Sequence, residues 1–175
     1  MNKEERQNEL LQAALNVFIE KGYKASTTIE IARAANISEV TLFRHFKSKE
    51  EIFMLSIKPV IEASLDMLKL DPSHENFKAS LRVALILRVD YINQHHQVIK
   101  LILNEQMLLK EYANVIDVMV KSLQDVLVTY GITQQIERKQ RLLMGMFLSF
   151  LYHPDVKRER IEEYCDFVLD QLLER

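Results

Sequence analysis

Residues 27–51 constrain the fold of this chain more than any other stretch, because they carry start and stop signals for short helices. Thr27 with Glu30 three residues later matches a capping box, which predicts that a helix begins there. Asn36 tolerates the left-handed backbone conformation that ends a helix. Ser38 is a suitable N-cap for a second helix. The stretch therefore predicts two helices of about two turns each, joined by a tight turn.

A second capping box, formed by Ser48 and Glu51, predicts that a third helix follows this pair directly. Two short helices joined by a turn of about three residues form the helix-turn-helix geometry, which places the second helix in the major groove of DNA. Val40 and Thr41 on that second helix suit contact with a thymine methyl group, and Glu39 suits a cytosine amine. The stretch is therefore a candidate DNA-binding segment.

This segment resembles the DNA-binding part of the TetR family of bacterial transcriptional regulators. The resemblance covers residues 6–54 and involves many positions, whereas the rest of the chain is similar to the family only in length and helical character. The matching pieces are Thr27-Thr28, Ile31-Ala32, Ile37-Ser38, Thr41-Leu42-Phe43, His45-Phe46 and Ser48-Lys49-Glu50. The resemblance implies an all-α dimeric regulator with DNA contacts from Thr28, Thr41, Phe43, His45 and Lys49.

Three positions depart from the family pattern without disturbing the expected fold. Asn36 stands where the family usually has glycine, and Val40 stands where it has a small residue or proline. Phe43 replaces a tyrosine whose hydroxyl commonly reaches a phosphate. Phe43 and His45 can also be core or structural residues, and Arg44 can reach a base or a phosphate. The candidate DNA-binding residues are Thr28, Glu39, Val40, Thr41, Phe43, Arg44, His45 and Lys49.

Composition agrees with an all-helical chain and sets limits on its partners. Only three glycines and three prolines occur in 175 residues, which favours long helices with short connections. One cysteine excludes an internal disulfide and fits a reducing cytoplasm. The N-terminus lacks the apolar core of a signal peptide, and no apolar run has the length needed to span a bilayer. Net charge is −2, so DNA binding would depend on a few well-placed cations.

Apolar spacing and turn signals divide the chain into about nine helices, with no strand pattern. We expect the first 57 residues to form a helix-turn-helix DNA-binding domain, and residues 58–175 to form a ligand-binding and dimerisation domain. Gly22 and Gly131 are expected to stop helices, Pro59 to kink or divide one, and His95 to end one. The expected helices cover residues 4–21, two short segments within 27–47, and residues 48–68, 77–95, 98–106, 108–130, 133–152 and 156–174.

The last two predicted helices are apolar over more than a single stripe, which is typical of an interface. Gly145 and Ser149 are small and one turn apart, so a partner helix could approach them closely. In the TetR family two such helices from each subunit form a four-helix bundle. The alternative is that these faces complete the core of the chain. The candidate dimer-interface residues are Gly145, Ser149, Phe150, Cys165, Val168 and Leu172.

The middle helices offer walls for a ligand pocket, although methionine or aromatic stripes at helical spacing are commonly plain core. The candidates are Tyr91, Met107, Met119 and Phe147. His95 and His96 with Glu105 suggest a metal site only weakly, because adjacent residues point to different sides of a helix. No nucleophile–base pair and no glycine-rich phosphate loop is present. We therefore expect no catalytic residues, no metal and no cofactor.

These observations favour a DNA-binding transcriptional regulator, and the resemblance to the TetR family implies that it is a repressor. It would bind a near-palindromic double-stranded operator as a homodimer and be released by a small apolar or amphipathic effector. One alternative is a DNA-binding regulator that is independent of ligand or controlled by a protein partner. The other is a helical-bundle enzyme with an incidental helix-turn-helix, which would require buried, facing acid and base groups.

Overall fold

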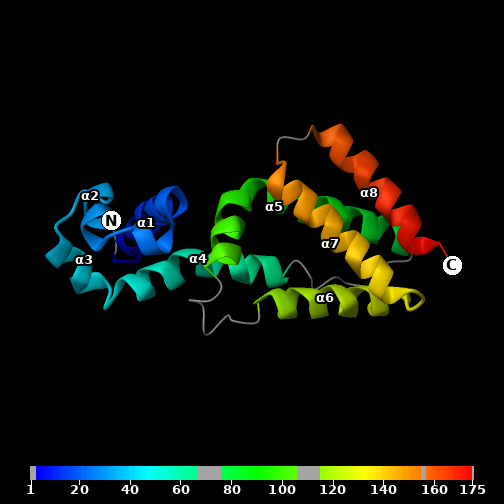
Figure 1. Cartoon of the computed structure of the whole chain (residues 1–175), viewed down its shortest axis with the longest axis horizontal. Coiled ribbons are helices and arrows are strands. Elements are labelled where there is room, and N and C mark those ends of the chain that lie inside the picture. Colours follow the sequence, from blue (N-terminus) through cyan, green and yellow to red (C-terminus); the bar gives the residue numbers. More distant parts are fainter. Residues whose placement is uncertain (1–2, 67–75, 106–114, 155–156, 175) are drawn as a thin grey trace. The chain divides into compact units, whose positions relative to one another are not determined.

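The computed structural model describes residues 3–66, 76–105, 115–154 and 157–174. These residues form eight helices and no strand (Figure 1), which confirms the all-α fold for the part of the chain described. The helices are α1 (Lys3–Ala25), α2 (Thr28–Ala34), α3 (Glu39–His45), α4 (Lys49–Asp66), α5 (Phe77–Asn104), α6 (Val115–Thr129), α7 (Ile136–Tyr152) and α8 (Arg158–Leu173).

Two helix ends differ from the sequence prediction in an informative way. Helix α5 covers both helices expected at residues 77–95 and 98–106, and its backbone leaves helical geometry at His95 (φ −111°, ψ 15°). The expected break is therefore a kink within one helix. Likewise, Gly22 adopts φ 77° inside α1, and helical turns resume as far as Ala25. Helix α4 continues through Pro59.

The chain divides into two compact units. Unit 1 comprises residues 1–62 and 97–113, and unit 2 comprises residues 63–96 and 114–175. Helices α4 and α5 therefore each contribute to both units. The boundary after residue 57 that the sequence suggested stays a prediction. Among the described residues, no helix combines the length and the apolar character needed to cross a membrane.

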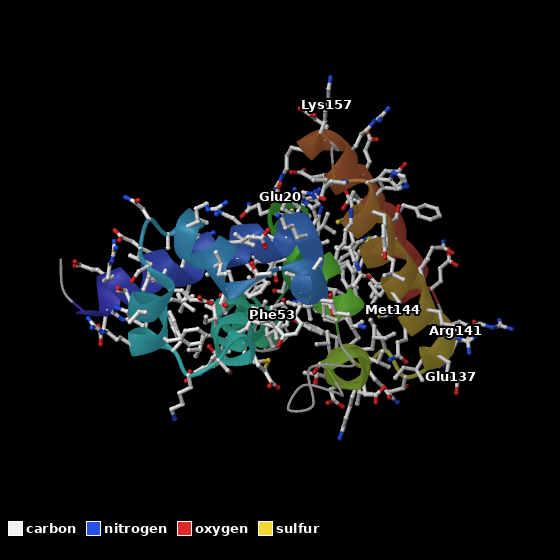
Figure 2. All side chains as sticks on the ribbon, turned by 60° about the vertical axis from the view of Figure 1, so that its left-hand side comes forward. Glu20, Phe53, Glu137, Arg141, Met144 and Lys157 are labelled. Carbon is white, nitrogen blue, oxygen red and sulfur yellow. The ribbon has the colours of Figure 1, made fainter. Side chains whose placement is uncertain are left out.

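An aromatic cluster fills the core of unit 1. Phe18 of α1 and Phe53 of α4 are fully buried, and their rings meet edge to face with centroids 5.1 Å apart. The Tyr23 ring lies 5.0 Å from that of Phe53, which Figure 2 labels within the ribbon of α4. Leu42 of α3 and Phe46, which follows it, are also buried. Each aromatic ring removes a large apolar area from water, so the contacts of Phe18 and Tyr23 with Phe53 hold α4 against α1.

The turn between α2 and α3 has the hydrogen bonds of a Schellman motif. Asn36 takes the left-handed conformation, with φ 54°. Its N–H donates to the carbonyl of Arg33, and the N–H of Ile37 donates to the carbonyl of Ala32, both at 3.0 Å. Ser38 then caps α3, because its hydroxyl accepts the N–H of Thr41 at 3.1 Å. The expected role of Asn36 as the stop residue is confirmed.

Substituting Asn36 tests this turn. Alanine carries a Cβ that disfavours the left-handed conformation and lacks the amide that offsets it, so Asn36→Ala should lower the free energy of unfolding by about 1 kcal/mol. Glycine enters this region freely, so Asn36→Gly should match the parent protein or exceed it slightly. Urea unfolding followed by circular dichroism measures both. Equal stability of the two variants would contradict the assignment of this turn.

Unit 2 is built from α6, α7, α8 and most of α5. Gly131, with φ 71°, ends α6 through the same pair of hydrogen bonds that ends α2. Helix α7 packs on both α6 and α8 (Figure 1). Exposed polar side chains such as Glu137, Arg141 and Lys157 point away from the ribbon in Figure 2. The buried side chains of α7 and α8 are Lys139, Leu143, Met146, Phe147, Phe150, Leu151, Ile161, Cys165, Val168, Leu169 and Leu172.

Candidate nucleic-acid interface

Helix α3 is anchored by one face and presents the other to solvent. Leu42 is completely buried and Phe46 is 2% exposed, so these two side chains fix the helix against the core of unit 1. Val40 is 67% exposed and Phe43 is 45% exposed, and Arg44 is exposed beside them. Apolar side chains this exposed on a rigid short helix suit a surface that becomes covered on binding. Phe43 is therefore not a core residue in this structure.

Two hydroxyl groups hold the start of α3 in place. The Thr28 hydroxyl, on α2, donates to the carboxylate of Glu39. The hydroxyls of Ser38 and Thr41 lie 2.9 Å apart in a hydrogen bond. Three of the predicted DNA contacts, Thr28, Glu39 and Thr41, are thus already engaged within the chain. Each keeps further acceptor positions, which suit a donor such as a base amine, whereas a phosphate oxygen would need the hydroxyl proton that Thr28 already gives to Glu39. Contact between these residues and DNA stays a prediction.

Lys49 has a structural role that the sequence did not reveal. Its ammonium donates to the carbonyl of Tyr23 at 2.8 Å and to that of Ser26 at 2.9 Å. The same group lies 4.3 Å from the centre of the Tyr23 ring. These contacts tie the first turn of α4 to the carbonyl groups at the end of α1. Contact between Lys49 and phosphate stays a prediction, and it would use the third N–H of an ammonium that already has two protein acceptors.

The N-terminus of α4 is capped as expected, with one difference. The Ser48 hydroxyl accepts the N–H of Glu51 at 3.1 Å. The Glu51 carboxylate, however, accepts the N–H of Lys47 rather than that of Ser48. Lys47 is exposed, and its side chain follows directly after α3. Lys47 therefore places a positive charge beside α3 that the sequence prediction did not single out.

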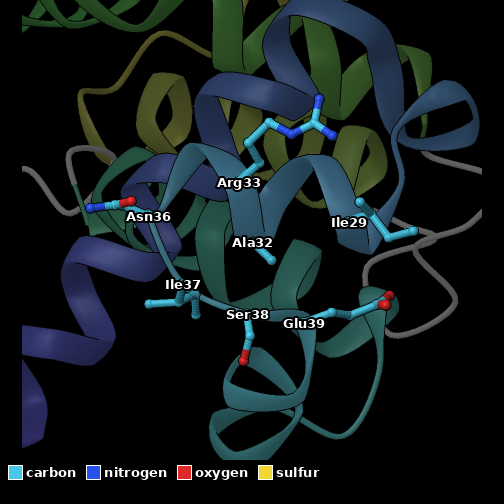
Figure 3. A pocket seen from close by; sticks show the side chains of 7 residues that line it. All are labelled: Ile29, Ala32, Arg33, Asn36, Ile37, Ser38 and Glu39. Atoms are coloured by element: carbon cyan, nitrogen blue, oxygen red, sulfur yellow. The ribbon is translucent and has the colours of Figure 1, made fainter.

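Two exposed side chains of α2 extend the same region. Ile29 is 57% exposed and Arg33 is exposed. Both line an open depression of about 460 Å³ that runs along the turn into α3 (Figure 3). The signal for Ile29 was present in the sequence, because it lies off the buried stripe that contains Ile31 and Ala32. The other lining residues are Ala32, Asn36, Ile37, Ser38 and Glu39.

An ion pair fastens the start of α2 to α1. The Lys21 ammonium lies 2.6 Å from a carboxylate oxygen of Glu30, whose other oxygen accepts both the N–H and the hydroxyl of Thr27 at 3.0 Å. The Lys21 ammonium and these Thr27 donors together lower the pKa of Glu30 from 4.5 to about 2. The capping box predicted from Thr27 and Glu30 is confirmed.

Acid should weaken this junction in a defined pH window. Because the folded pKa of Glu30 is depressed, its stabilisation is complete above pH 4.5 and is lost as the pH falls towards about 2. Glu30→Gln should therefore lower stability at pH 7 and flatten the decline between these pH values. Urea unfolding across this pH range measures the effect, with Glu20→Gln as the control on the same surface. An unchanged pH profile in Glu30→Gln would refute it.

The predicted dimer-interface residues of α7 and α8 differ in their exposure to solvent. Gly145 and Ser149 are exposed on α7, whereas Phe150, Cys165, Val168 and Leu172 are buried within the chain and serve as its core. Burial raises the pKa of the Cys165 thiol to about 11, which suits a core residue rather than a nucleophile. The role of those four residues at a dimer interface stays a prediction. The exposed apolar residues of α7 and α8 are Leu148, Tyr152, Tyr164 and Phe167.

The structure describes the side chains of two of the four predicted pocket residues, and their role in a pocket stays a prediction. Phe147 is buried on α7, and Tyr91 of α5 is partly exposed with its ring 4.3 Å from that of His95. Met107 and the side chain of Met119 lie outside the described residues. His96 bonds the main-chain oxygen of Asn93 at 2.9 Å. Within the described part of the chain, no group of three His, Cys, Asp or Glu side chains comes together as a metal site would require.

Comparison with known proteins places the helix-turn-helix in a family. A family model described as "Bacterial regulatory proteins, tetR family" matches residues 10–54, which contain α2 and α3. The HTH-type transcriptional regulator TcmR of Streptomyces glaucescens is 39% identical over 69 residues, which cover 39% of this chain and 30% of TcmR. The HTH-type transcriptional repressor KstR2 of Mycolicibacterium smegmatis is 41% identical over 63 residues, covering 36% of this chain and 29% of KstR2. The matches therefore span less than a third of these relatives' length.

The fold of the whole chain has counterparts among solved structures. The ketosteroid transcriptional regulator KstR2 of Mycobacterium tuberculosis matches with a TM-score of 0.76 over 97% of this chain and 96% of that one. Sequence identity is 21%, so this likeness concerns the fold alone. The relatives named here are transcriptional regulators rather than enzymes. The helix-turn-helix match and the whole-chain fold agree, and residues 10–54 carry the DNA-binding segment of the TetR family of bacterial regulatory proteins.

Proposed function

We propose that this protein is a transcriptional repressor that binds a near-palindromic DNA operator as a homodimer and is released by a small apolar or amphipathic effector. The observation that carries the proposal is α3. It is anchored by Leu42 and Phe46, and it presents Val40, Phe43 and Arg44 to solvent. Such a helix can enter the major groove, where apolar side chains meet thymine methyl groups and arginine reads guanine.

The charges of unit 1 support this use. Arg33, Arg44 and Lys47 are exposed around the turn and along α3, and none forms an ion pair among the described residues. Three uncommitted cations on one small surface suit phosphate contacts on either side of a groove. The overall charge of −2 does not oppose this, because DNA meets the local surface rather than the whole chain.

A dimer supplies the second half-site. Leu148 and Tyr152 of α7 and Tyr164 and Phe167 of α8 are each between 44% and 61% exposed, and α7 packs on α8. Gly145 and Ser149 are exposed on the same half of α7 and leave room for another helix. We infer that these two helices pair with their counterparts in a second copy. The two α3 helices must then lie about 34–36 Å apart, or a multiple of this, to enter successive major grooves.

Release by an effector requires that the effector bind more tightly to a form whose half-site spacing does not fit the operator. Unit 2 is larger than a pair of dimerisation helices requires, which leaves α5 and α6 for ligand binding. The name of one relative, a repressor, supports the sign of regulation proposed here.

Selection of bound duplexes from a random DNA library by the purified protein tests the proposal. The expected result is enrichment of a near-palindromic sequence, with one half-site for each subunit. Repeating the titration of that sequence with candidate effectors then tests release. Recovery of no preferred sequence by a folded, dimeric protein would contradict the proposal.

A further inference from the structure

One buried charge in unit 2 has no counter-charge among the described residues. Arg88 of α5 is 5% exposed. Its Nη1 donates to the main-chain oxygen of Ser64 at 2.5 Å, and its Nε has no hydrogen-bond partner within the part of the chain that the structure describes. Buried guanidinium groups are ordinarily paired with carboxylates, since an unpaired charge in a low-dielectric interior is costly. Burial accordingly lowers the pKa of Arg88, although an arginine remains charged.

In the same unit, the carboxylates pair with arginines whose side chains are more exposed than that of Arg88. Arg82 of α5, whose side chain is 35% exposed, pairs with Asp166 at 2.5 Å and Glu162 at 3.2 Å. Arg158 of α8, whose side chain is 53% exposed, pairs with Asp90 and Glu162. Exposed pairs of this kind contribute little to stability, whereas a buried guanidinium gains much from a partner. The acceptor that Arg88 lacks is therefore one that the described part of the chain does not provide.

The surroundings of Arg88 combine one more polar group with an apolar surface. Tyr91 lies one helical turn further along α5 and shares a side-chain hydrogen bond with Ser64. Burial raises the pKa of Tyr91 above its ordinary value, so its hydroxyl is neutral at physiological pH. Leu85 and Ile92, at three- and four-residue spacing from Arg88, are buried on the same face of α5. This arrangement resembles a ligand site, with a few convergent polar groups on apolar walls.

We propose that Arg88 is the anion-binding group of the effector site in unit 2, and that the effector is a small amphipathic carboxylate. Nε–H and the neighbouring Nη2–H form the edge of a guanidinium that binds a carboxylate through two parallel hydrogen bonds. A single guanidinium balances one negative charge, which favours a carboxylate over a dianionic phosphate. The apolar body of the effector would pack along α5 beside Leu85 and Ile92. This inference rests on the proposed function, which assigns an effector to unit 2.

Matched acids and alcohols test the chemistry of the site. The full-length protein is titrated with straight-chain carboxylates from hexanoate to hexadecanoate, and with the primary alcohol of each length, while the melting temperature is recorded. Binding to the folded state raises the melting temperature with concentration. At least one chain length is expected to bind at least ten times more tightly as the acid than as the alcohol, because a hydrogen bond to a charged group is lost in the alcohol.

Variants assign the effect to Arg88. Arg88→Met keeps the length and apolar stem of the side chain, and should weaken acid binding at least tenfold and remove the preference for acid over alcohol. Without ligand it should melt no lower than the parent, because it removes an uncompensated buried charge. Arg88→Lys keeps the charge without the fork and should lie between the two. Arg82→Met is the matched control and should retain the preference for acids.

If Arg88→Met fails to fold, acid binding is compared in two milder variants. Arg88→Lys retains the positive charge, and Tyr91→Phe retains the shape of the ring. If no acid binds the parent protein better than its alcohol, the inference is wrong. DNA binding by the same samples then still tests the proposed repressor. Acids that bind through Arg88 without changing affinity for the selected DNA would leave the anion site intact and contradict its effector role.

Discussion

Gly145→Arg is expected to convert the protein to a monomer and abolish tight operator binding. An added Cβ at Gly145 meets no atom of the described residues within 4 Å, and the position is exposed, so we expect the fold of one subunit to tolerate the substitution. In a symmetric dimer, two arginines would face each other across closely packed α7 helices. Burying like charges costs several kcal/mol, so the dimer dissociation constant should rise by at least about 100-fold.

Sedimentation and operator titration measure this effect together. Gln124→Arg, at an exposed position of α6, adds the same charge away from α7 and α8 and should remain dimeric. Phe167→Asp probes the same interface from α8, where the ring is 61% exposed. A Gly145→Arg protein that remains dimeric and binds DNA as the parent does would place the subunit interface elsewhere.

Arg44→Ala should cause the largest loss of DNA affinity among substitutions that leave the fold intact. Arg44 is exposed on α3, and each good contact from arginine to a base is worth about 1–3 kcal/mol. A dimer makes this contact twice, so the expected loss is about 2–6 kcal/mol for the selected operator. Sequence preference at the contacted base pair should relax as well.

Two comparisons separate base reading from phosphate contact. Lys47→Ala should weaken binding to all sequences and lower the slope of log affinity against log salt by about two units, one for each subunit. Arg138 lies at an exposed position of α7, and Arg138→Ala should leave both the DNA affinity and its salt dependence unchanged. Fluorescence anisotropy titrations at several salt concentrations measure them. Equal affinity of Arg44→Ala and the parent for the selected operator would remove α3 from the interface.

Local signals explain why the helix-turn-helix could be predicted from the sequence. Helix starts and stops depend on hydrogen bonds to residues only a few positions away. The capping box of Thr27 and Glu30, the left-handed Asn36 and the N-cap Ser38 each lie where the sequence predicted them. The burial of Leu42 and Phe46 leaves Val40 and Phe43 exposed, whereas the sequence left open whether Phe43 and His45 belong to the core. A short segment whose caps and apolar positions agree has few alternative structures.

Long-range partners were beyond the reach of such signals. Lys49 caps carbonyls that lie more than twenty residues earlier in the chain, and nothing in its neighbours indicates this. Phe150 and Cys165 lie on wide apolar arcs, and spacing identifies an apolar face without showing whether the chain itself or a second copy covers it. The sequence gives no sign that Arg88 differs from the other charged residues of α5, and only its burial in the structure sets it apart from them.

The most direct measurement of the central claim is the DNA selection performed in parallel with the parent protein and with Arg44→Ala. The parent should enrich a near-palindromic duplex whose half-sites are one helical turn apart or a multiple of it, and Arg44→Ala should fail to enrich that duplex. Enrichment of the same duplex by both proteins, or of none by the folded parent, would contradict an operator-binding role for α3.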